Sequence, residues 1–505
     1  MKKGAEKYKA AATDDYSGAL PGKLLEENIA FFNGIFKKDS VLRQKKIIVH
    51  GVYNYGCALF YMDGMVDSEL ITESIVKPLL LVQNERTEGS FADYIKNQVL
   101  FASETKSTEN VADMLRAVLY GDTLLLIDGC LTAITINTKG WRTRGISEPS
   151  DERILQGPRE GFDEAALLNV AMIRRKLLTP DLCTEMVRIG RRSDTIVFIC
   201  YLDSLADGAM VAELKRRLSK INIDGVLDTN YIAELIRDKP RSLFKTSGTT
   251  ERPDIVAARL LEGRIALIAD GTPVVLTFPY LFSENFQSDE DYYLNYAIAS
   301  VGRVLRYICF FLSVSIPAVF IAAATYHKEL LPTSLALTVT QLRGGVPFPA
   351  FAECILLIFV FEILKETGVR MPQSLGHALS IVGGLVVGQA AVEARIISAP
   401  MLIIVALAGI SGLMIPRLKG AVFYFRIIFV CLSALFGLYG YIAGFTLMLI
   451  HILQLSSLGV SSTASLNSAD KRSLKDTFWR APWKNMHTRP IFCRNSVRME
   501  NKKSD

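Results

Sequence analysis

Long apolar runs fill the C-terminal third of the chain and are separated by short polar connections. Five runs are present, at residues 304–326, 350–364, 375–392, 399–416 and 422–453. A helix of about 20 apolar residues crosses a ~30 Å hydrocarbon layer, and a soluble core does not sustain so many uncharged positions. The pattern therefore predicts an all-α, multi-span membrane domain over residues 301–455, with four to five spans.

The shortest run, residues 350–364, contains Glu353 and Glu362. Basic residues gather near the C-terminus, which favours a cytoplasmic tail, and no apolar stretch of secretory type follows Met1. Two cytoplasmic ends require an even number of crossings, so residues 350–364 are predicted to be re-entrant or interfacial. Five spans with the tail outside are the alternative.

The polar region before the apolar runs contains an internal repeat. Residues 55–67 (YGCALFYMDGMVD) resemble residues 195–207 (TIVFICYLDSLAD), and residues 121–129 (GDTLLLIDG) resemble residues 263–271 (GRIALIADG). The offsets of 140 and 142 residues are nearly equal, which indicates duplication. The short apolar runs are typical of buried strands, and helical patterns lie between them.

The expected fold class is therefore an α/β soluble region of two similar subdomains, followed by an all-α membrane domain. The subdomains are placed at residues 24–145 and 165–283, with a linker at 146–164 that is rich in Gly, Pro and charge. The remaining segments are a flexible N-terminus at 1–23, a connector at 284–300 and a basic tail at 456–505.

Four aspartates follow the repeated strands, namely Asp63, Asp67, Asp203 and Asp207. They can be interpreted as metal ligands or acid/base groups, but caps of the next helices are the favoured interpretation. The sequence has no Walker lysine motif, His-Glu-x-x-His, Gly-x-Ser-x-Gly or dinucleotide fingerprint, and its eight cysteines and five histidines are scattered. We expect no catalytic site, no cofactor and no metal site.

Charge is unevenly distributed along the 505 residues, whose formal net charge is +6. Residues 1–300 carry −5, residues 301–470 carry +4 and residues 471–505 carry +7. In the tail, basic and aromatic residues are interleaved: Trp479, Arg480, Trp483, Lys484 and Arg489. Such a tail fits anionic membrane lipid; nucleic acid would use similar charges, but the position after an apolar run favours the membrane.

Seven segments, which follow one another in the family's order along the chain, carry a resemblance to a known family. They are GPREGFDEAALLNVAMIRRKL (157–177), RPDIVAARLLEGRIALIADGTPVVLTFPYLF (252–282), DEDYY (289–293), GVPFPAFAE (345–353), FEILKETGVRMP (361–372), IVGGLVVGQAAVEARIIS (381–398) and LKDTFWRAPWKNMHTRP (474–490). Together they resemble the A subunits of the GerA family of spore germinant receptors, from about residue 24 to 490. Residues 491–505 extend beyond the family pattern.

The resemblance implies a setting and partners. Such A subunits reside in the inner membrane of bacterial endospores and act with a transporter-like B subunit and a lipoprotein C subunit. The A subunit is expected to form a homo-oligomer whose ion-conducting pore opens on nutrient binding. An A-subunit-like sporulation paralogue that assists ion release is an alternative within the family. A secondary transporter is a further alternative, although transporters usually repeat within the membrane region.

Ionisable and small residues inside the apolar runs are candidates for the ion path, because buried charge in a membrane is costly. The predicted pore or coupling residues are Glu353, Glu362, Gly384, Val386, Val387, Gly388, Gln389 and Glu393. Glu353 and Glu362 are nine residues apart and face opposite sides of a helix, so both cannot line one pore. Glu393 and Arg395 also fit a membrane boundary, and the Gly-x-x-x-Gly of Gly384 and Gly388 also fits close helix packing.

Overall fold

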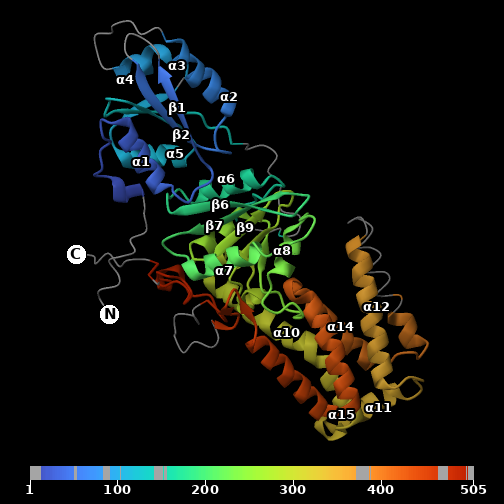
Figure 1. The fold of residues 1–505 in the computed structure, drawn as a ribbon. Helices are drawn as coiled ribbons and strands as arrows, with labels where there is room; N and C mark the ends of the chain where they lie inside the picture. The colour runs from blue at the N-terminus through green and yellow to red at the C-terminus, as the bar shows by residue number, and fades with distance from the viewer. Residues whose placement is uncertain are drawn as a thin grey trace.

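A computed structural model describes residues 13–49, 54–82, 91–102, 104–141, 152, 156–370, 386, 388–464, 476–495 and 497–498. Two α/β units lie one above the other, and a group of long helices extends from the second unit (Figure 1). The C-terminal residues return from the helices to the second unit.

The first unit is a five-stranded antiparallel sheet with helices on both faces. Its strands are β1 (Leu42–Val49), β2 (Tyr55–Met62), β3 (Thr105–Thr108), β4 (Thr123–Ile127) and β5 (Ala133–Ile136), in the order β1-β2-β4-β5-β3. Helices α1 (Leu25–Ile35) and α5 (Val111–Leu119) pack on one face. The other face is covered by α2 (Ser68–Ile71), η3 (Thr72–Val76), α3 (Lys77–Leu81), α4 (Phe91–Tyr94) and η4 (Ile95–Val99). Burial of both faces explains why β2 and β4 are continuous apolar runs.

The second unit repeats this arrangement. Its strands are β6 (Leu182–Ile189), β7 (Thr195–Leu202), β8 (Gly248–Thr250), β9 (Ile265–Ala269) and β10 (Val275–Phe278), in the equivalent order β6-β7-β9-β10-β8. Helices α6 (Ala166–Lys176) and α9 (Pro253–Leu260) cover one face, and α7 (Gly208–Leu218) and α8 (Thr229–Leu235) cover the other. The two pairs of sequence-related segments form β2 and β7, and β4 and β9.

The hydrogen bonds that start the first helix of each unit are also repeated. Asn28 exchanges two hydrogen bonds with the backbone of Gly22, and Asn169 does the same with Asp163. Asp128 and Asp270, which follow β4 and β9, each accept a 3.0 Å hydrogen bond from the first turn of that helix. Such matching of polar contacts supports the duplication inferred from the sequence.

The aspartates after β2 and β7 have structural partners. Asp67 caps α2 and Asp207 caps α7, which confirms the capping interpretation for these two residues. Asp63 instead pairs with Arg43 at 3.0 Å, and Asp203 pairs with Lys38 at 2.6 Å.

The helices comprise α10 (Tyr296–Thr325), α11 (Thr333–Arg343), α12 (Ala350–Arg370), α14 (Ala399–Leu413) and α15 (Lys419–Leu453). We call the end at which α10 begins proximal, and the opposite end distal. Among the described residues, two helical stretches, Tyr296–Thr325 and Pro416–Leu453, are long and apolar enough to cross a membrane, and Ala399–Leu413 is a shorter apolar helix.

The run at 422–453 is two antiparallel helices rather than one segment. Gly437 interrupts α15 with φ 60° and ψ −141°, a backbone conformation that suits glycine. Phe429 of the first arm lies against Tyr441 and Phe445 of the second, with ring centroids 5.8 and 6.3 Å apart. The arms of 18 and 16 residues each extend about 25 Å. Counting this run as one segment was therefore wrong, because one glycine reverses the chain without a polar loop.

The segment at 350–364 is longer than its apolar run suggests. Helix α12 continues to Arg370, and its 21 residues span about 31 Å. Its first turn contacts Ser398 at the distal end, and Glu366 lies 3.8 Å from Lys419 at the proximal end. The helix therefore extends along the whole group of helices.

The C-terminal residues are built into the second unit. Strands β11 (Ser456–Ser457) and β12 (Val460–Ser461) form a hairpin whose Leu458 joins the core on the α7 face. Cys493 is buried in the core on the other face, where its Sγ contacts Leu205 O at 3.4 Å. Residue 493, beyond the recognised family pattern, thus contributes to packing.

The reversal at Gly437 predicts a specific cross-link. A side chain placed at Gly444 meets the side chain of Leu432, so Leu432→Cys with Gly444→Cys, in a Cys431→Ser background, should form a disulfide on mild oxidation. The measurement is mass spectrometry of the oxidised chain. Gly420→Cys with Leu432→Cys is the control, because twelve residues in one straight arm span about 18 Å, beyond disulfide reach. Equal cross-linking of both pairs, or of neither, would contradict the hairpin.

Candidate functional site

Buried charges join three parts of the molecule at the proximal end of the helices. Arg303, in the second turn of α10, is fully buried between Asp291 at 3.3 Å and Asp476 at 2.8 Å. Asp291 belongs to η6 (Asp289–Tyr292) of the connector, and Asp476 belongs to the C-terminal segment. Arg306 adds a second ion pair to Asp291 at 2.9 Å. We call this arrangement the charged junction.

The junction continues into the second α/β unit through Glu284. Arg264, at the start of β9, donates to Glu284 at 2.5 Å and to Pro279 O at 2.8 Å. Burial disfavours the charge of Glu284, but Arg264 and Arg259 hold the pKa of this carboxyl below its ordinary value. Burial likewise opposes the charge of Arg264, yet Glu284 and Glu262 raise the pKa of its guanidinium. Each charge is stable there because its partner is present.

Arg417 connects the turn between α14 and α15 to the same connector. Its guanidinium donates to Glu284 O at 3.1 Å and Gln287 O at 3.3 Å, and pairs with Asp289 at 3.2 Å. The second sheet, the start of α10 and the α14–α15 turn therefore share one set of polar partners. Movement of any one element has to break several of these contacts.

The C-terminal segment also packs against the charged junction through Arg480. Arg480 is buried, donates to Leu294 O at 2.7 Å and stacks between Tyr292 and Trp483. The expectation that Arg480 faces lipid was therefore wrong, because the ring of Tyr292 and a backbone carbonyl use its charge. Trp479, Trp483 and Lys484 remain exposed.

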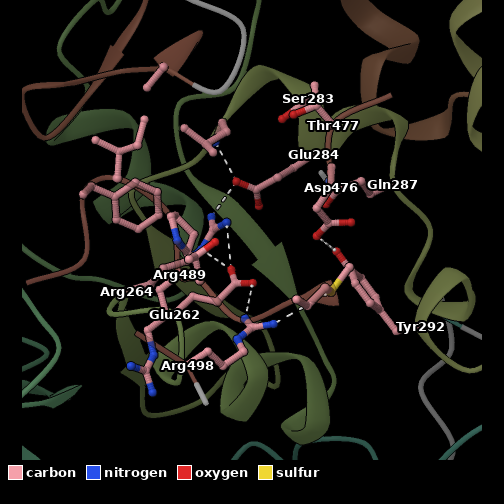
Figure 2. Close-up of a pocket in the computed structure, with 17 residues that line it drawn as sticks. Glu262, Arg264, Ser283, Glu284, Gln287, Tyr292, Asp476, Thr477, Arg489 and Arg498 are labelled. Carbon is pink, nitrogen blue, oxygen red and sulfur yellow. Dashed lines mark hydrogen bonds and ion pairs between the residues drawn. The ribbon is translucent and has the colours of Figure 1, made fainter. Parts of the chain in front are cut away.

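A cavity of about 90 Å³ lies beside the junction. Figure 2 shows Glu262, Arg264 and Arg498 pointing toward one another, and Tyr292 donating to Asp476. Arg498 and Arg264 each lie 3.2 Å from Glu262. The described residues hold no group of three His, Cys, Asp or Glu side chains that could bind a metal ion. Opposite charges from different segments are paired here, and such pairs are suited to coupling the movements of those segments.

A second buried arginine joins the helices to one another. Pro317 lies inside α10, so the carbonyl of Ser313, four residues earlier, loses its usual helical donor. Arg426 of α15 donates to this Ser313 O at 2.7 Å and to Ala408 O of α14 at 2.9 Å. One side chain thus satisfies backbone groups of two neighbouring helices.

Small residues allow this close contact. A Cβ at Gly412 would lie 2.9 Å from Ser313 Oγ, and one at Gly409 would lie 2.5 Å from the ring of Phe361. Helices α10, α12 and α14 therefore approach around Arg426. Arg426 was not among the predicted site residues; its isolation in an apolar run, together with a proline in another helix, was the available signal.

The predicted pore residues divide into buried and exposed positions. Glu353 is fully buried and accepts hydrogen bonds from Ser398 N and Oγ at 3.0 and 2.7 Å, with Arg343 at 3.3 Å. It thereby anchors the start of α14. Glu362 is partly exposed and lies 3.6 Å from Lys365. The two glutamates do not share a surface, as their spacing predicts.

The structure describes only some of the candidates between residues 384 and 393. Gly384 and Val387 lie outside the described residues. Val386 is 56% exposed, and a Cβ on Gly388 would meet Leu402 at 3.6 Å. Gln389 donates to Glu393 at 2.9 Å, and both are exposed.

Loss of Arg303 tests the charged junction. We expect Arg303→Gln to lower the free energy of unfolding by about 3 kcal/mol, because Asp476 and Asp291 lose a buried partner. Denaturant unfolding in mild detergent, followed by the fluorescence of Trp479 and Trp483 in a Trp141→Phe background, measures the change. Arg188→Gln is the control, since its exposed pair with Asp194 contributes at most about 1 kcal/mol. Equal effects of the two changes would show that the junction does not stabilise the chain.

Comparison with known proteins places this architecture in a family. The family model described as Bacillus/Clostridium GerA spore germination protein matches residues 30–492. Spore germination protein KA of Bacillus subtilis (strain 168) is 41% identical over 429 residues, which cover 84% of this chain and 78% of that protein. The uncharacterized membrane protein YfkQ of the same organism is 37% identical over 449 residues, which cover 88% of this chain and 87% of that protein.

Two further proteins are similar over different lengths. Spore germination protein GerLA of Bacillus cereus is 34% identical over 439 residues, which cover 86% of this chain and 89% of that protein. The crystal structure of the N-terminal domain of the A subunit of the Bacillus megaterium spore germinant receptor GerK3 aligns with a TM-score of 0.42 and 30% identity, over 52% of this chain and 98% of that domain. The family match and the similarity to spore germination proteins KA and GerLA show that the chain belongs to the GerA family of spore germination proteins, among its A-type subunits.

Proposed function

We propose that the chain is the A subunit of a spore nutrient germinant receptor and that several copies form a ligand-gated ion channel. The observation that carries the proposal is the charged junction, which joins an α/β region to a group of apolar helices through Arg303, Glu284 and Arg417. A signal received at the α/β region would reach the helices through these contacts. Release of ions through the open channel would start germination.

The arrangement of the helices supports a membrane domain with an even number of crossings. Helix α10 leaves the proximal end, and the second arm of α15 returns to it, where His451 lies 3.0 Å from Ser242 of the second unit. The α/β region and the C-terminal segment therefore lie on one side, which we propose is the cytoplasmic side of the inner spore membrane. Apolar side chains remain exposed along the helices, including Ile403, Ile410, Leu435, Ile442 and Leu447.

The packing of one copy leaves little space for an ion path beside Arg426, which favours a path between copies. The cavity beside Arg426, lined by Glu362 and Lys365, holds only about 10 Å³. Val386, Gln389 and Glu393 are exposed and are available to line a path at a contact between copies. Homo-oligomerisation would bring such positions together around an axis.

Family resemblance supplies the partners of this proposal. We propose that the chain acts with a transporter-like B subunit, which recognises the nutrient, and with a lipoprotein C subunit. The alternative within the family is an A-subunit-like sporulation paralogue that assists ion release. A secondary transporter is less well supported, because the repeat lies in the α/β region and the transporter scheme requires paired halves among the helices.

Recordings from planar bilayers test the channel. We expect discrete conductance steps from the purified full chain, and a lower preference for cations over anions in Glu393→Gln if this exposed carboxylate lines the path. Glu353→Gln is the matched control, because its buried carboxylate anchors α14 and should affect stability rather than selectivity. Slow flux without steps would support a transporter, and loss of selectivity in Glu353→Gln alone would place the path elsewhere.

A further inference from the structure

The segment between α8 and β8 lies against the proximal ends of the helices. Phe244 is buried and stacks on Phe425 of α15, with ring centroids 5.4 Å apart. Ser242 lies 3.0 Å from the ring nitrogen of His451 near the end of α15. Phe425 is six residues inside the first arm of α15, so the segment reaches one to two turns below its proximal end.

The alternate residues of this segment face away from the protein. Arg241, Leu243 and Lys245 are exposed, whereas Ser242 and Phe244 are buried. Leu243 is 44% exposed, and Leu235 at the end of α8 is 52% exposed. An apolar side chain flanked by cations, beside apolar helices, is typical of a protein surface at the edge of a membrane.

The cations here lack anionic partners in the protein. Within the described part of the chain, Arg237, Arg241 and Lys245 form no ion pair, and Nε of Arg237 is buried without an acceptor. Asp238 is already paired with Arg217. Desolvation and the charges of Arg237 and Arg417 lower the pKa of Lys245, and the charge of Glu152 opposes this shift.

We propose that this segment binds the headgroups of anionic phospholipids, with Leu243 as an apolar anchor and with Arg237, Arg241 and Lys245 as phosphate ligands. The proposal rests on the proposed membrane location of the helices. Charge complementarity and depth favour lipid as the occupant, because the segment lies level with the first two turns of α15. Arg480, which was predicted to make such a contact, is occupied inside the charged junction.

Titration of the full chain in detergent with fluorescent phosphatidylglycerol tests the proposal. Replacing all three cations, with Arg237→Gln, Arg241→Gln and Lys245→Gln, should weaken the apparent affinity by about fivefold for each removed charge. The control carries Arg191→Gln, Arg192→Gln and Lys220→Gln, three exposed cations of the same α/β unit that lie away from the helices. We expect the control to bind like the wild type.

A second variant guards against misfolding. Leu243→Ser leaves the charge unchanged and should weaken binding less than the triple change, while fluorescent phosphatidylcholine should bind weakly to every variant. Affinity for phosphatidylglycerol that is unchanged in the triple variant would overturn the proposal, and a protein partner would then be the occupant. Complete displacement by inorganic phosphate would also overturn it in favour of a soluble anion.

A separate measurement tests the membrane location of the helices. Incorporation of the wild-type chain into lipid nanodiscs reports on the location of the helices alone. A chain that enters nanodiscs, with lipid affinity that does not depend on the three cations, would contradict only the headgroup site. A chain that does not enter nanodiscs would contradict the membrane location itself.

Discussion

The ion pairs of Arg303 with Asp291 and Asp476 fix where the helices stand relative to the α/β region. Arg303 is fully buried, so loss of either carboxylate would leave charge in a low-dielectric site at a cost of several kcal/mol. The same constraint applies to the buried pair of Glu284 with Arg264, and the partly buried pair of Arg417 with Asp289 adds to it. Three segments that are distant in the sequence are therefore held in one arrangement, and a second arrangement needs a new set of partners. The charged junction is therefore suited to a protein that transmits a signal from one region to another.

Among the helices, Arg426 is also a buried charge, but different groups stabilise it. Pro317 frees the carbonyl of Ser313, and Arg426 satisfies it while also binding Ala408 O. The cost of a charge among apolar helices is thus offset by backbone groups rather than by a carboxylate. Gly409 and Gly412 are required there because larger residues would separate the helices. The charged junction and this contact share a single helix, α10, which carries both Arg303 and Ser313.

Local patterns predicted much of this fold, and long-range contacts explain the remainder. The repeat was readable because both units need continuous apolar strands buried on two faces, and capping by Asp67 and Asp207 follows from their positions after β2 and β7. The hairpin at Gly437 was missed because a single glycine reverses the chain without a polar loop that would mark the reversal. The roles of Arg303, Arg426 and Arg480 depend on partners more than 90 residues away, which no local pattern reveals. Glu353 was chosen because it is a charge within an apolar run. Local sequence likewise does not reveal its partner Ser398, through which it anchors α14.

The central claim is that the charged junction holds the α/β region and the helices as one unit. Distances between a spin label at Lys220→Cys on the second unit and one at Leu330→Cys at the distal end, with the partly exposed Cys130 and Cys431 replaced by Ser, test it most directly. We expect one narrow distance distribution in the otherwise unchanged chain and a broad or displaced one after Arg303→Gln. A broad distribution in the unchanged chain, or an identical narrow one after Arg303→Gln, would contradict it.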